Sequence, residues 1–182
     1  MKAFIESHLK SIPWTDLFFV FGGAALLCAT SQIEIPLKPV PVTLQTVAVM
    51  LIGLTYSPRR AVEAISLWIA LAAVGFPVLA EFSGGLAKLM GPTGGYIAGF
   101  VLAVYLMATL KEKFSLNSWQ SDVLLTLLGT LVVFTTGTLW LSHLIGWSNA
   151  FSYGVLPFIL PGVVKGGLLC TALQILRHAR RG

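Results

Sequence analysis

The sequence predicts an all-α integral membrane protein, folded as a compact six-transmembrane-helix bundle with both termini in the cytoplasm. Composition is the first reason: 56% of the 182 residues are hydrophobic and only 10% are charged, whereas soluble domains are about a quarter charged. The mean hydropathy of +0.85 agrees. The apolar residues also fall into six segments, and basic residues gather between alternate segments. The length allows a single domain, residues 1–182.

The six segments are separated by prolines, glycines and charges. Spanning a bilayer takes about 20 apolar residues, with a lower limit of about 17. Trp14, whose ring suits the membrane interface, introduces the first segment. We expect that segment to be a retained span, because no clear cleavage site follows it. The predicted spans are residues 17–33, 43–56, 61–80, 95–110, 123–145 and 161–176.

The basic residues predict the orientation in the cell membrane. With six spans, both termini lie on one side, and most of the Lys and Arg residues lie there too. Only Lys38 and Lys88 fall on the opposite side, and Lys165 lies near the start of the sixth span. The positive-inside rule therefore makes the basic side cytoplasmic. The residues on that side are Lys2, Lys10, Arg59, Arg60, Lys111, Lys113, Arg177, Arg180 and Arg181.

The three connections on the predicted outer side are long and rich in glycine, proline and aromatic residues. They read IEIPLKPVPV, EFSGGLAKLMGPTGGY and GWSNAFSYGVLPFIL. Irregular backbone at membrane depth is tolerated only where it is buried in protein or lines a cavity. We therefore expect a ligand site in the outer half of the bundle. The net charge of +5 does not predict nucleic-acid binding, because the basic residues form no stripe with exposed aromatic residues.

Lys165 is the most informative single residue. Pro157 and Pro161 precede it, and prolines favour helix starts, so we expect Lys165 in the first turn of the sixth helix. A charge inside a bilayer is costly and usually marks a ligand or ion path. The alternative is a lysine that extends its ammonium to the outer headgroups. A cation at a helix N-terminus favours an anionic partner.

Other candidate groups lie at the outer ends of the predicted helices. Gly94-Gly95-Tyr96 opens the fourth helix, where free backbone N–H groups could bind a carboxylate or a polar ring. An ordinary helix entry is the alternative. Thr43 and Gln45 lie where the proline-rich connection enters the second helix. Their polar groups could bind a ligand or satisfy contacts between helices.

The sequence gives little support for a catalytic site, a nucleotide-binding site or a metal site. The GGLAKLMGPTGG stretch lacks the spacing of a Walker A or dinucleotide-binding motif, and it faces away from cytoplasmic ATP. No Ser–His–Asp, Cys–His or paired-carboxylate arrangement can be assembled. Cys28 and Cys170 lie in apolar segments without metal-ligand spacing and are interpreted as buried hydrophobic residues. We expect no catalytic residue, no metal and no cofactor, so any ATP hydrolysis belongs to another chain.

Ala25 and Ala29 give the first predicted helix a face of small residues. They are four positions apart and therefore lie on the same side of the helix. Small residues at this spacing allow another helix to approach closely. That helix could belong to the same chain or to a separate membrane subunit.

Four stretches resemble the BioY family, the biotin-binding S components of energy-coupling factor (ECF) transporters. They are IPLKPVPVTLQT (35–46), Pro58-Arg59-Arg60, GFPVLAEFSGGLAKLMGPTGGY (75–96) and LPFILPGVVK (156–165), in the family's order. The resemblance implies high-affinity capture of biotin on the outer side, in a deep pocket capped by outer loops. It also implies docking on a transmembrane T component that works with a pair of cytosolic ATPases.

The resemblance also implies roles for single residues. Lys165 corresponds to the family's lysine at the start of the sixth helix, and Ala25 and Ala29 to the face that docks on the T component. Ser83 stands where the family commonly has asparagine, and Gly162 stands where it usually has aspartate. Phe82 is expected among the aromatic groups around the biotin rings. The expected substrate-binding residues are Lys165, Ser83, Gln45, Tyr96, Thr43, Gly84, Gly85 and Trp68.

Two other classes of function remain open from the residues. A stand-alone importer of biotin or another small molecule would work without ATPase subunits. An intramembrane enzyme would need a catalytic pair near Lys165, which the sequence does not supply.

Overall fold

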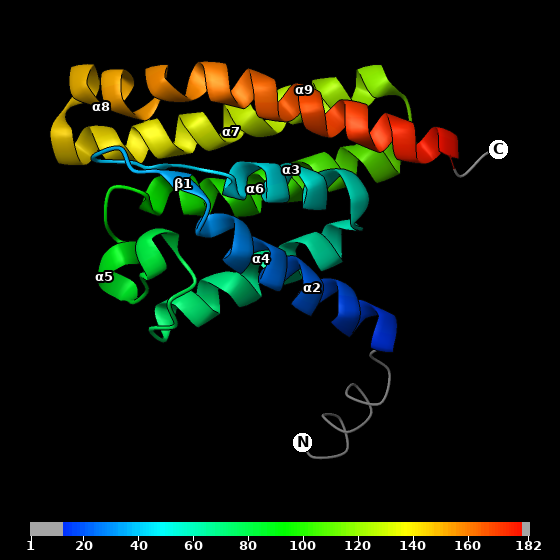
Figure 1. Ribbon diagram of the computed structural model, residues 1–182, viewed down its shortest axis with the longest axis horizontal. Coiled ribbons are helices and arrows are strands. Elements are labelled where there is room, and N and C mark those ends of the chain that lie inside the picture. The colour runs from blue at the N-terminus through cyan, green and yellow to red at the C-terminus, as the bar shows by residue number, and fades with distance from the viewer. Residues whose placement is uncertain (1–12, 180–182) are drawn as a thin grey trace, which may run out of the picture.

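The computed structural model describes residues 13–179 and is almost entirely helical (Figure 1). In chain order the elements are α2 (Trp14–Ser31), β1 (Glu34–Ile35), β2 (Val42–Thr43), α3 (Gln45–Thr55), α4 (Pro58–Ala73), the 3-10 turn η1 (Ala80–Phe82), α5 (Leu86–Leu89), α6 (Gly94–Lys113), α7 (Trp119–Ile145), α8 (Trp147–Gly154) and α9 (Leu156–Ala179). The two short strands pair antiparallel, with Glu34 opposite Thr43.

Helix α6 lies at the centre of the bundle. It packs most extensively against α7 and also contacts α3 and α4, while α2 packs on α4 and α9 packs on α7. Two glycines allow the close approach of α6 and α7. A Cβ atom on Gly95 would lie 2.2 Å from the Trp140 Cβ, and one on Gly99 would lie 2.2 Å from the Thr136 Oγ1. The Gly95 position is therefore used for helix packing.

Four segments of the described chain are long and apolar enough to cross a membrane. They are Trp14–Ser31, Gly94–Lys113, Trp119–Ile145 and the run Trp147–Ala179, which combines α8 and α9. Helix α3 is apolar but shorter. The expectation of a multi-pass membrane protein is confirmed at this level, and the finer count of six spans stays a prediction.

The two ends of the bundle differ in character. The connections 32–44, 74–93 and 146–155 gather at one end, called the loop end (Figure 1). The start of α2 and the end of α9 lie at the other, called the terminal end. There Arg60 pairs with Asp16, joining the first turns of α4 and α2, with its Nε 2.6 Å from the Asp16 Oδ1. The terminal end therefore collects short connections and charges.

The two helix boundaries that differ most from the prediction do so for physical reasons. Helix α4 ends at Ala73, not near residue 80, because Gly75 adopts a φ of +96° and Pro77 follows. Helix α9 begins at Leu156 and contains Pro161 in its interior. Pro157, in the first turn, is the proline that suits the helix start. Lys165 is therefore in the third turn of α9, and the prediction that it lies in the first turn is wrong.

Candidate ligand-binding site

Two neighbouring cavities lie among α3, α6, α7 and α9. The loop cavity, of about 60 Å³, is bordered by two connections of the loop end, 32–44 and 74–93. The lysine cavity, of about 40 Å³, extends from it along α9 to Lys165. Thr46, Val133, Phe134 and Phe158 line both cavities and form the partition between them. The sequence predicted a ligand site in the outer half of the bundle, and the loop cavity lies toward the loop end.

Aromatic rings form the partition and one wall. The Phe158 ring stacks on Tyr96, with centroids 6.3 Å apart and planes inclined by 24°. Phe134 meets the other side of Phe158 edge-on, at 6.1 Å. The Tyr96 hydroxyl donates a hydrogen bond of 2.8 Å to the Gly154 carbonyl, which fixes that ring. Rings held in this way form a fixed apolar wall suited to the ring system of a ligand.

Lys165 contributes the charge of the site. Its half-buried side chain lines the lysine cavity, and its Nζ donates a hydrogen bond of 2.7 Å to the Thr43 carbonyl oxygen. Among residues 13–179, no carboxylate lies within ion-pair distance of this ammonium. Gly162, one turn earlier on α9, also lines the cavity, and a Cβ atom there would have no neighbour within 4 Å. An ammonium without a counter-charge beside an apolar cavity favours a ligand that accepts hydrogen bonds or carries negative charge.

Gln45 and Thr43 both line the loop cavity. Gln45 is 7% exposed and donates from its Nε2 to the Ser31 Oγ at 2.9 Å. The Ser31 hydroxyl in turn donates to the Leu27 carbonyl at 2.6 Å. In this series of hydrogen bonds, the Gln45 Oε1 has no hydrogen-bond partner among the described residues. The Gln45 amide therefore has an acceptor to offer inside the site.

Ser83, Gly84, Gly85 and Trp68 line neither cavity. The Ser83 hydroxyl donates to the Ala80 carbonyl at 2.5 Å. A Cβ atom on Gly84 would lie 2.2 Å from the Phe76 oxygen. Trp68 is fully buried and donates from its Nε1 to the Val78 carbonyl at 3.0 Å. These residues shape the 74–93 connection, and a direct ligand contact from any of them stays a prediction.

Phe82 and the opening of α6 make no direct contribution of polar or aromatic groups that the structure identifies as ligand-facing, apart from the Tyr96 ring. Phe82 is 72% exposed and lines neither cavity, so its place around the ligand rings stays a prediction. Its φ of 50°, next to a φ of 61° at Glu81, turns this part of the loop outward. At the start of α6, the Gly94 and Tyr96 N–H groups donate to the Gly91 and Thr93 carbonyls. Those two donors make ordinary helix-entry contacts, although the Tyr96 ring does line the loop cavity.

Gln32 holds the 74–93 connection against the end of α2. Its Nε2 donates to the Leu79 carbonyl at 3.0 Å, and its Oε1 accepts from the Phe82 N–H at 3.0 Å. Leu79 and its neighbour Ala80 line the loop cavity. Gln32 therefore positions a wall of the site without contacting the cavity. Sequence reasoning missed it, because its partners lie about fifty residues further along the chain.

Lys88 is a second cation at the site and was not predicted as one. It lines the loop cavity from α5, and its Nζ lies 2.9 Å from the Glu81 Oε2. The hydrogen bond from Lys88, reinforced by its positive charge, lowers the pKa of the Glu81 carboxyl. The ion pair connects two parts of the 74–93 connection. In the described residues no group of His, Cys, Asp or Glu side chains could hold a metal ion.

The comparisons with known proteins all concern biotin transporters. The family model of BioY matches residues 5–181. A protein named probable biotin transporter BioY from Pyrococcus horikoshii is 40% identical over 78% of this chain and 83% of its own length. One of the same name from Rickettsia prowazekii is 31% identical over 100% of this chain and 93% of its own length. The crystal structure of the S-component for biotin from an ECF-type ABC transporter superposes with a TM-score of 0.81, at 26% identity, covering 90% of this chain and 91% of that one.

Proposed function

Because the chain belongs to the BioY family, we propose that it is the high-affinity biotin-binding membrane subunit, or S component, of an ECF-type vitamin uptake system. It captures biotin on the outer side and delivers it inward when docked on a T component with cytosolic ATPases. The names of its relatives support transport over catalysis. It carries no cofactor of its own, and biotin is its transported substrate.

The observation that carries this proposal is an ammonium, that of Lys165, which has no carboxylate partner among residues 13–179 and lines a cavity together with aromatic rings. Biotin has a compact bicycle with a planar ureido group and a valerate chain that ends in a carboxylate. Tyr96 and Phe158 suit the bicycle, and the Gln45 Oε1 can accept from a ureido N–H. The Lys165 ammonium donates to an acceptor on biotin, either the carboxylate or the ureido oxygen, instead of to the Thr43 carbonyl. One ureido N–H and one acceptor of biotin then have named partners within the two cavities.

Biotin needs more room than the two separate cavities offer, at about 60 and 40 Å³. The Phe158 ring stands between them and lines both. Loading therefore requires Phe158 to rotate or the 74–93 connection to move outward. Rotation of Phe158 joins the cavities into one pocket that reaches from the loop end to Lys165, and outward movement of the 74–93 connection widens the loop cavity.

The same proposal includes six spans and cytoplasmic termini. Helices α3 and α4 have 11 and 16 residues, which is short for crossing a bilayer alone. Two features support their inclusion: the three long connections share the loop end, and Arg59, Arg60, Lys111 and Arg177 belong to helix ends on the other side (Figure 1).

Purified full-length protein in detergent is expected to bind radiolabelled biotin, and excess unlabelled biotin should displace it. A thermal-shift screen against biotin, thiamine and riboflavin tests specificity, since a ligand that binds only the folded state raises the melting temperature. Biotin should give the largest shift. A larger shift with another vitamin, or no displaceable biotin, would contradict the proposed substrate.

The docking surface for the T component is proposed to be the Ala25 and Ala29 face of α2. Both residues are exposed, although α2 is a membrane-span candidate. Small exposed residues on such a helix suit close packing by a helix of another subunit. The T component would then meet the protein along α2, on the side away from α9 (Figure 1).

The double variant Ala25→Trp, Ala29→Trp is expected to abolish co-purification with co-expressed T component and ATPases, because two indole rings prevent close helix approach. Biotin binding by the isolated variant should remain. The matched control is Leu131→Trp with Thr135→Trp, an exposed pair at the same spacing on α7. Undiminished co-purification of the α2 variant would show that this face is not the docking surface.

A further inference from the structure

A surface groove runs between α7 and α9. These two helices lie on the side of the bundle away from α2 and α4 (Figure 1). It has a volume of about 350 Å³. Leu127 and Phe134 border it on α7, and Val163 and Gly167 on α9. A Cβ atom on Gly167 would meet nothing within 4 Å. Both helices belong to membrane-span candidates, so the groove faces hydrocarbon in the bilayer.

The groove continues into a polar basin at the terminal end. The basin, of about 410 Å³, lies between the first turn of α7 and the last turns of α9. Trp119 lines both the groove and the basin and therefore connects them. Gln120, Gln174, Arg177 and His178 also line the basin. A long apolar channel with one polar end matches the shape of a phospholipid.

The positive charge of the basin favours a negatively charged lipid headgroup. The Arg177 Nη1 lies 2.6 Å from the Asp122 Oδ2 and 3.3 Å from the Asn117 carbonyl oxygen. Within residues 13–179, no partner is recorded for its Nε or Nη2, and no acidic residue lines the basin. Guanidinium groups with free donors bind phosphate oxygens well. Basic pockets between helices on the cytoplasmic side of a membrane commonly bind anionic headgroups.

We propose that the groove and basin bind one anionic phospholipid. An acyl chain occupies the groove along Gly167, and the phosphate group lies in the basin against Arg177. A docked partner helix fits less well, because Leu127 and Val163, 58% and 66% exposed, project at the rim. The proposal rests on the proposed orientation, in which the terminal end is cytoplasmic, but it uses neither biotin nor the T component. Failure of lipid retention is therefore distinguishable from failure of biotin binding.

Native mass spectrometry of the full-length protein tests the groove, using phosphatidylglycerol and phosphatidylcholine of the same chain length. The wild type should retain phosphatidylglycerol preferentially. Gly167→Leu should lower the phosphatidylglycerol-bound fraction about fivefold, because the leucine fills the groove. Gly22→Leu is the matched control, since a Cβ there also meets nothing within 4 Å but lies on α2. Equal retention of both lipids, or no effect of Gly167→Leu, would overturn the proposal.

A second pair of variants tests the basin. Gln174→Glu adds a negative charge inside the basin, and Lys113→Gln removes a positive charge at the same end of the bundle, outside it. Both change the net charge by the same amount. Only Gln174→Glu should lower phosphatidylglycerol retention about fivefold. Equal effects of the two variants would mean that lipid retention depends on net charge and not on the basin, and would contradict the basin site. Protein dimers retained in place of lipid would identify the groove as a dimer interface.

Discussion

Lys165→Ala is expected to lower the affinity for biotin by about 100-fold. The ammonium is half-buried, lines the lysine cavity and has only the Thr43 carbonyl as a recorded partner in the described chain. A hydrogen bond to a charged group in such surroundings contributes up to about 3 kcal/mol, which corresponds to a factor of about 100. Equilibrium binding of radiolabelled biotin to the purified variant measures the change.

Two further variants separate charge from packing. Lys165→Met keeps the unbranched stem and removes only the ammonium, so it should lose nearly as much affinity as Lys165→Ala. Lys38→Met removes another lysine of the loop end that lines neither cavity, so its affinity should equal that of the wild type. Wild-type affinity in Lys165→Ala would remove Lys165 from the site. Normal affinity in Lys165→Met alone would assign its role to packing.

The sequence predicted the parts of this protein that depend on local composition. The apolar segments, the prolines between them and the basic connections predicted a helical membrane protein. The isolated Lys165 in an apolar segment predicted a residue that lines the candidate site. The turn of α9 that carries Lys165 was not predictable, because Pro157 and Pro161 both suit a helix start. Only packing of α9 on α7 distinguishes them.

The parts that were missed depend on contacts between distant segments. Phe158 lies at the site because α9 brings its ring against Tyr96, and Gln32 positions the loop through residues about fifty positions away. Such contacts have no local pattern. Lys111 and Arg177 illustrate the same limit, since they were interpreted only as basic residues that orient the protein. In the structure they share one buried acid.

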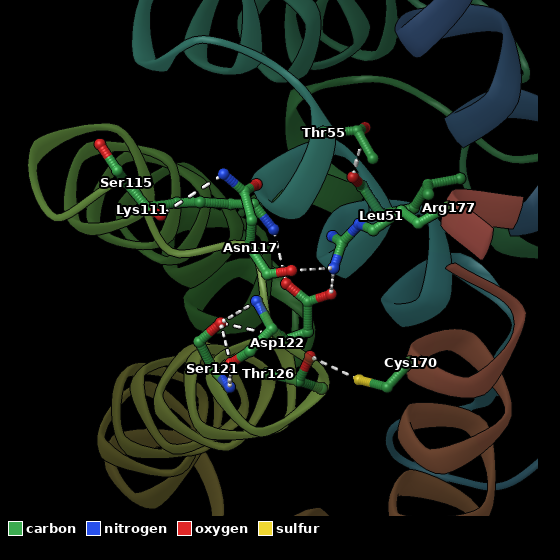
Figure 2. Close-up of polar contacts among 11 residues, drawn as sticks. Leu51, Thr55, Lys111, Ser115, Asn117, Ser121, Asp122, Thr126, Cys170 and Arg177 are labelled. Carbon is green, nitrogen blue, oxygen red and sulfur yellow. Dashed lines mark hydrogen bonds and ion pairs between the residues drawn. The ribbon is translucent and has the colours of Figure 1, made fainter. Parts of the chain in front are cut away.

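That acid is Asp122, which joins three helices at the terminal end (Figure 2). Its side chain is fully buried in the first turn of α7. The Lys111 Nζ of α6 lies 2.5 Å from its Oδ1, and the Arg177 Nη1 of α9 lies 2.6 Å from its Oδ2. The side chains of Lys111 and Arg177 are only 14% and 25% exposed. The single carboxylate of Asp122 therefore partly compensates two cations that are themselves largely removed from water.

Asp122→Ala is expected to reduce the free energy of unfolding by about 3–5 kcal/mol, because removing one member of a buried ion pair leaves uncompensated charge. For a chain of this length the melting temperature should fall by about 10 °C. Thermal unfolding in detergent measures the shift. The matched control is Glu63→Ala, which breaks the exposed pair between Arg59 and Glu63 and should leave the melting temperature nearly unchanged.

The triple variant Lys111→Met, Asp122→Leu, Arg177→Met shows whether the loss comes from unpaired charge or from damaged packing. Replacing a whole buried ion cluster by apolar side chains is often neutral or stabilising, so the triple variant should regain most of the melting temperature lost in Asp122→Ala. A triple variant no more stable than Asp122→Ala would contradict the electrostatic explanation. A melting temperature for Asp122→Ala close to that of Glu63→Ala would show that this ion cluster does not hold α6, α7 and α9 together.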